Sequence, residues 1–201
     1  VTQRAWPLVF GLILGLPTGP GWTAGLSIDY PFAVGVGEEI EFTVRLEDVG
    51  TDAVGGYDLS LQFSGPASLA GQTFGTLLNG EADSAASFRG FSFAAPSGMI
   101  QVYEVSRLTP AQLRELQAGR DSLALFTVVM TAEETGSARL DLAEDGLALF
   151  VDAEGRAIAP IDLSAVTADV AILSATTASP ADPGEDGAAP PPAAELGRPQ
   201  H

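Results

Sequence analysis

Aspartates are the residues of this sequence that could do the most chemistry, and their most suggestive spacing runs from Asp141 to Asp152. Counted from Asp141, positions one, five, six and twelve of a calcium-binding loop are matched. Position three is Ala143, which offers no side-chain oxygen. Asp141, Asp145 and Asp152 are therefore the calcium candidates, but a turn with solvated carboxylates explains them more simply.

Paired carboxylates can also hydrolyse glycosidic bonds, if two acids stand roughly 5–10 Å apart in a cleft. The chain has 26 acidic residues, so chance pairs are numerous, and no pair is marked by its spacing. The sequence therefore predicts a non-catalytic protein, with a glycoside hydrolase as a remote alternative.

Aromatic residues between positions 88 and 103 form the candidate binding face, because flat rings can stack on sugar rings. These residues are Phe88, Phe91, Phe93 and Tyr103. In an extended strand Phe91 and Phe93 share one face, and Phe88 points to the other. Core packing is the competing explanation for these rings. Three other aromatic residues are expected in the core: Tyr57, Phe63 and Phe126.

Composition removes several classes of function. The chain of 201 residues has no cysteine, and its only histidine is His201 at the end of the sequence. It has no lysine either, so thiolate, Schiff-base and Ser-His-Asp chemistry are all disfavoured. The formal net charge of −17 repels phosphate backbones and anionic lipids, so we expect no nucleic-acid partner.

The first 25 residues resemble a secretory signal. Arg4 supplies a positive start, residues 6–16 are apolar, and small residues precede position 26. The apolar run of eleven residues is too short to cross a bilayer, and no later stretch is long enough. We therefore expect a secreted protein, periplasmic or extracellular, without membrane insertion after cleavage.

Alternation of apolar and polar residues predicts strands throughout residues 26–173. The clearest lie at 40–46 and 54–63, and residues 122–131 are apolar on both faces, which favours a central core strand. Further strands are expected at 26–30, 88–94, 99–105, 137–142, 147–151, 157–161 and 166–172. Roughly nine strands indicate an all-β, antiparallel sandwich of jelly-roll or immunoglobulin-like type.

One short helix interrupts the strands. Thr109, Pro110 and Gln112 form a capping-box sequence, and Gly119 marks the end of the helix. Residues 174–201 are rich in alanine and proline and are expected to form a disordered tail.

The order of several segments resembles the cohesin-like modules of the carbohydrate-binding superfamily of sandwiches. The matching pieces lie at 26–30, 36–44 (VGEEIEFTV), 56–63 (GYDLSLQF), 74–75, 105–113 (VSRLTPAQL) and 123–130. The sequence is also similar to short secreted proteins of Gram-negative bacteria that carry a PEP-CTERM sorting tail. The tail here ends in Gly197-Arg198-Pro199-Gln200-His201, without that motif, so sorting is not expected.

This resemblance implies a nine-stranded jelly roll with a non-catalytic binding role at or outside the cell envelope. A protein partner bound through one sheet face is the first expectation. An extracellular polysaccharide is the alternative, and a calcium-dependent surface component is a third. No cofactor is expected apart from that calcium candidate.

Overall fold

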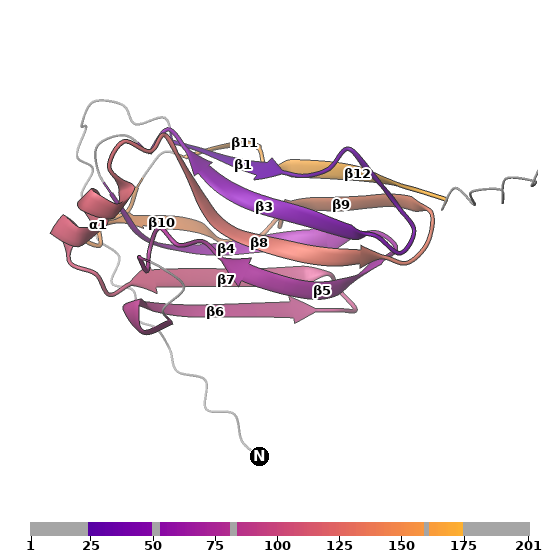
Figure 1. Ribbon diagram of the computed structural model, residues 1–201, viewed down its shortest axis with the longest axis horizontal. Helices are drawn as coiled ribbons and strands as arrows, with labels where there is room; N and C mark the ends of the chain where they lie inside the picture. Colours follow the sequence, from indigo (N-terminus) through magenta and orange to yellow (C-terminus); the bar gives the residue numbers. More distant parts are fainter. Residues whose placement is uncertain (1–23, 50–52, 81–83, 159–160, 175–201) are drawn as a thin grey trace, which may run out of the picture.

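Two β-sheets packed face to face form the protein in the computed structural model (Figure 1). The structure describes residues 24–49, 53–80, 84–158 and 161–174. Most of the predicted signal (1–25) and all but the first residue of the predicted tail (174–201) lie outside the described residues. The first strand begins at Gly25 and the last ends at Leu173, close to the expected boundaries of 26 and 173.

The sheets differ in size. The five-stranded sheet has the order β11 (Asp162–Ala165), β1 (Gly25–Asp29), β3 (Glu39–Glu47), β8 (Ser122–Ala132) and β5 (Ala67–Phe74). The seven-stranded sheet has the order β2 (Ala33–Gly35), β12 (Thr167–Leu173), β9 (Gly136–Leu142), β4 (Val54–Ser64), β7 (Met99–Ser106) and β6 (Ser87–Ala94). Its remaining strand, β10 (Ala148–Asp152), pairs with the first half of β4 on the edge opposite β7, and β9 pairs with the end of β4 along the same edge as β10.

The predicted β-sandwich with one short α-helix is confirmed, but the described residues form twelve strands instead of nine. The sheets are also mixed, because β1 pairs with β11 and β2 with β12 in parallel. The unexpected strands β2, β5 and β11 are short or rich in small and polar residues, so they lack the alternation that marks a half-buried strand. Of the strand expected at 157–161, the described residues show one isolated bridge, between Val151 and Ala157.

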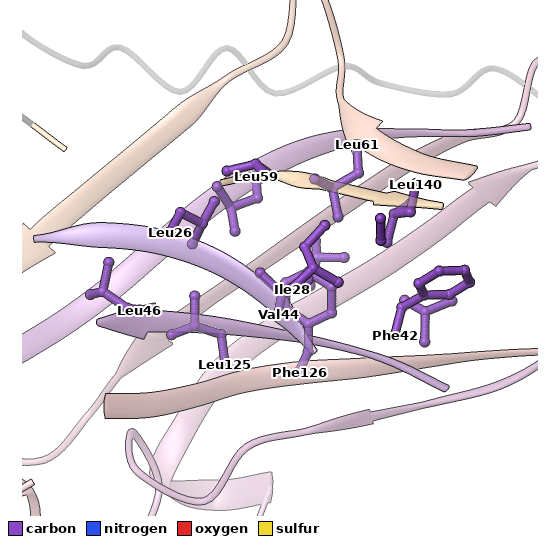
Figure 2. Close-up of a cluster of buried hydrophobic side chains, with 14 of the residues drawn as sticks. Leu26, Ile28, Phe42, Val44, Leu46, Leu59, Leu61, Leu125, Phe126 and Leu140 are labelled. Carbon is purple, nitrogen blue, oxygen red and sulfur yellow. The ribbon is translucent and has the colours of Figure 1, made fainter. Parts of the chain in front are cut away.

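The core lies between the two sheets and follows from the alternation. On β3 the inward residues Ile40, Phe42, Val44 and Leu46 are fully buried, while Glu39, Glu41 and Thr43 alternate with them on the outer face. Leu59 and Leu61 of β4 meet this layer from the other sheet, as Figure 2 shows. Tyr57, Phe63 and Phe126 are all buried, as expected.

The predicted helix is α1 (Pro110–Gln117), and both hydrogen bonds of its capping box form. The Thr109 N–H donates to Gln112 Oε1 at 2.9 Å, and the Gln112 N–H donates to Thr109 Oγ1 at 3.4 Å. A helix this short needs tertiary contacts for stability. Leu113 supplies an apolar contact, and Gln117 pairs with the backbone of Val54 through two 2.8 Å hydrogen bonds.

Among the described residues, no helix combines the length and the apolar character needed to cross a bilayer.

Candidate functional site

A groove of about 510 Å³ crosses the outer face of the seven-stranded sheet. Its lining residues come from β6, β7, β4 and β10, whose arrangement can be followed in Figure 1. Its lining is mostly apolar and comes from strands that are far apart in the sequence. Its walls include Phe88, Tyr103, Val105, Leu149 and Val151. Phe88 and Val105 are 57% and 46% exposed, which is high for apolar side chains in regular strands.

Gly56 forms the floor of the groove because it has no side chain. It pairs with Val105 on β7 and with Val151 on β10, so these two valines stand on either side of it. A Cβ atom at position 56 would lie 2.9 Å from the backbone oxygen of Glu104 and 3.2 Å from Val105. The missing side chain at position 56 therefore leaves the hollow, and any larger residue at this position would collide with β7.

Tyr103 owes its position to a second glycine. Tyr103 pairs with Gly90 across the β6–β7 ladder, and a Cβ at position 90 would lie 2.5 Å from ring atoms of Tyr103. The tyrosine ring therefore lies across Gly90. It also contacts Phe88, with 5.6 Å between ring centroids and 36° between ring planes. The two rings form one apolar wall.

Asp58 is the one charged residue among the described residues that line the groove. It stands between two walls, since it pairs with Tyr103 on β7 and with Leu149 on β10. Its Oδ1 atom is buried and accepts no hydrogen bond from the described residues. Burial raises the pKa of Asp58 above its ordinary value, and a hydrogen bond from the Gln101 side chain offsets part of the rise in this pKa.

Beneath the groove floor lies a small polar layer inside the sandwich. Glu104, only 1% exposed, accepts a 3.2 Å hydrogen bond from Asn79 Nδ2. The Tyr57 hydroxyl donates to the carbonyl oxygen of Leu125 at 3.1 Å. Burial raises the pKa of Glu104, while Ser87, Arg89, Asn79 and Tyr57 each lower it in part. These contacts hold the strands that carry the groove residues.

The structure brings two of the four predicted aromatic residues together at the groove, Phe88 and Tyr103. The other two, Phe91 and Phe93, point to the opposite face of β6 and pack partly buried against the core. The alternation of β6 produces this division, as the sequence predicted.

The three calcium candidates do not converge, and Asp145 is exposed in the turn between β9 and β10. Asp141 pairs with Gln62 near the end of β4, whereas Asp152 pairs with Val54 at its beginning, so about 26 Å of strand separates them. Asp141 forms a hydrogen-bonded ion pair with Arg139, and this hydrogen bond lowers the pKa of Asp141. Asp152 Oδ1 accepts the N–H groups of Glu154 and Arg156 in a turn. In the described part of the chain, no group of three or more acidic or histidine side chains could hold a metal ion.

Sequence reasoning missed Asp58, Val105 and Leu149 as groove residues. Each was visible as an outward position on an alternating strand, but alternation does not reveal which outward positions become neighbours. The Gly55-Gly56 pair inside a strand was a usable signal, because glycine within a strand often marks a close approach of other atoms.

No protein-family model matches the chain, and no curated protein matches it. Solved structures do. A cohesin module from a Clostridium perfringens family 33 glycoside hydrolase has a TM-score of 0.56 at 16% identity, covering 77% of this chain and 100% of that one. A type II cohesin domain from the cellulosome of Acetivibrio cellulolyticus also has a TM-score of 0.56, at 11% identity over 74% of this chain and 95% of that one.

A cohesin in a type I cohesin–dockerin complex from Clostridium thermocellum has a TM-score of 0.54 at 15% identity, covering 74% of this chain and 99% of that one. The fold is therefore that of the cohesin modules. The described residues form a cohesin-like domain, as the order of the sequence segments predicted.

Proposed function

We propose that this protein is a non-catalytic binding module that engages a protein partner through the outer face of its seven-stranded sheet. The groove carries the proposal. Its exposed apolar residues, Phe88 and Val105, are fixed by regular strands and lie beside a polar position, Asp58. Apolar residues near a few placed polar groups are typical of a protein-binding surface.

Two further observations support this proposal. Some of the solved cohesins that share this fold are in complexes with dockerins. The groove also presents a single carboxylate among its described lining residues, whereas glycoside hydrolysis requires two. A binding role therefore fits the groove better than a hydrolytic one.

We place this binding at or outside the cell envelope of a Gram-negative bacterium. The support is the apolar segment at 6–16, preceded by Arg4 and followed by small residues, which is typical of an export signal. Fractionation of the host, with an antibody against the protein, would test this location. Recovery in the cytoplasm would contradict it.

Site-specific photocrosslinking tests the protein-binding proposal. A photoreactive amino acid replaces Gln101 in the groove or, as a matched control, Glu41 on the outer face of the five-stranded sheet. Each protein is irradiated with the secreted and envelope fractions of the host. We expect one crosslinked protein from position 101, removed by excess unlabelled protein and not formed from position 41. Equal crosslinking from both positions, or none from position 101, would contradict the proposal.

Carbohydrate binding is the second candidate, and the aromatic wall favours it. The ring of Tyr103 lies across Gly90 in the groove, and Asp58 and Gln101 stand nearby with groups that could bond to sugar hydroxyls. Retention of the protein on an insoluble polysaccharide, lost in Tyr103→Ala and kept in Phe91→Leu, would support a glycan ligand.

A further inference from the structure

The polar group in the groove and its apolar walls together define the chemistry of an occupant. Asp58 stands between Tyr103 and Leu149, and no cationic side chain is among the described residues that line the groove. A partly buried carboxylate without a counter-charge is unfavourable, because water that would stabilise the charge is excluded. A ligand that brings a positive charge would remove this cost.

The walls select the shape of that ligand. Apart from the Gln101 side chain, the space next to Asp58 is apolar, with the Tyr103–Phe88 ring pair on one side and Leu149 with Val151 on the other. Arginine and lysine side chains have the same division, since an apolar stem carries a charged tip. A cation near an aromatic ring gains further attraction, and a guanidinium group can also stack on it.

The charge of the whole protein also favours a positively charged ligand. A net charge of −17 attracts basic partners and speeds their association. On the same sheet face, Arg139 is already paired with Asp141 and lies 3.5 Å from Asp169. The charge of Arg139 is therefore already paired with carboxylates other than that of Asp58.

We infer that the groove receives a long basic side chain, arginine or lysine, from the protein partner, with its charged tip at Asp58 and its stem between Tyr103 and Leu149. This inference rests on the proposed function and specifies the partner's chemistry. Recognition then depends on one charge pair within an apolar contact surface.

Nuclear magnetic resonance titration with small probes tests the inference in the full chain. The probe is N-acetyl-arginine methylamide, and its neutral match is the corresponding citrulline compound. We expect the arginine compound to shift the amide signals of Gly56 and Tyr103 and to bind about fivefold more tightly than citrulline, the upper range for partly exposed ion pairs. In Asp58→Asn this preference should disappear, whereas Asp29→Asn should retain it.

The Asp29 control removes the same formal charge from the outer face of the other sheet, where Asp29 lies 3.5 Å from Arg45. Equal binding of both compounds, a preference that survives in Asp58→Asn, or no binding of the arginine compound by a folded protein would overturn the inference. Tighter binding of a methyl glucoside than of the arginine compound would also overturn it.

The two proposals fail separately. If crosslinking from position 101 identifies a protein partner but the probes show no charge preference, the inference fails and the proposed function stands. If the arginine compound binds as expected but no protein is crosslinked, the proposed function fails and the charge preference of the groove stands.

Discussion

Tyr57 and Glu104 face each other across the β4–β7 ladder, and both side chains are buried between the sheets. Their sequence neighbours Gly56, Asp58, Tyr103 and Val105 point the other way and line the groove. The groove is therefore supported by a polar layer instead of an apolar one. Burial raises the pKa of Tyr57 well above its ordinary value of 10.0, so its hydroxyl remains a donor.

We expect Glu104→Gln to change how stability depends on pH. Because burial raises the pKa of Glu104, the folded protein holds this proton more tightly than the unfolded chain does. The stabilising contribution is thus present in acid and is lost as the pH rises through the raised pKa. Glutamine cannot titrate, so the variant should lose this part of the pH dependence and be at least as stable as the parent at neutral pH.

Urea denaturation at a series of pH values measures this effect. Gln112→Ala is the control, because it removes the exposed side-chain hydrogen bonds from Thr109, removes no titrating group, and Gln112 is not among the side chains that shift the pKa of Glu104. Parallel pH profiles for the parent and Glu104→Gln would show that Glu104 titrates as it does in the unfolded chain.

Gln117 should contribute far more to the free energy of unfolding than Gln112, although both residues lie on α1. The buried Gln117 amide bonds with both backbone groups of Val54 and donates to the Leu77 carbonyl at 2.9 Å. Gln117→Ala leaves these buried groups unpaired and should lower the free energy of unfolding by about 2–4 kcal/mol. Gln112→Ala removes an exposed cap and should cost about 1 kcal/mol. Equal losses in urea denaturation would disprove this difference.

Gly90→Ala should disturb the groove with little effect on the core. The new methyl group would overlap the Tyr103 ring, which can move because it lies on the outer face of the sheet. We expect the ring-current shifts that Tyr103 and Phe88 produce on each other to change and binding of the arginine compound to weaken. The free energy of unfolding should change by no more than about 1 kcal/mol. Gly71→Ala is the control, since a Cβ there meets no atom within 4 Å. Unchanged ring shifts in Gly90→Ala would contradict the placement of Tyr103.

Binding of the arginine probe should weaken in acid. Protonation of Asp58 removes the charge that attracts the probe, and because burial raises the pKa of Asp58, the loss should begin at a higher pH than for an ordinary aspartate. Titrations with the arginine compound across the acid range measure this dependence, and the citrulline compound is the control. A pH-independent affinity for the arginine compound would show that the charge of Asp58 does not contribute.

Local sequence was sufficient for the elements that depend on local physics. The alternation at 40–46 and 54–63 predicts which face of β3 and β4 is buried, because successive side chains in a strand point to opposite faces. The Thr109–Gln112 capping box likewise predicts the start of α1, because its hydrogen bonds join residues three apart. The order of these elements was enough to indicate a cohesin-like sandwich.

Strand β5 and the groove, in contrast, depend on the tertiary structure. Strand β5 has no clear pattern, and its backbone is ordered by pairing with β8, more than fifty residues later in the chain. The groove likewise depends on registry, because Gly56 lies between Val105 and Val151 only after β7 and β10 pair with β4. Alternation determines the face on which a residue lies. Its neighbours on that face are determined by long-range strand pairing, which no local pattern encodes.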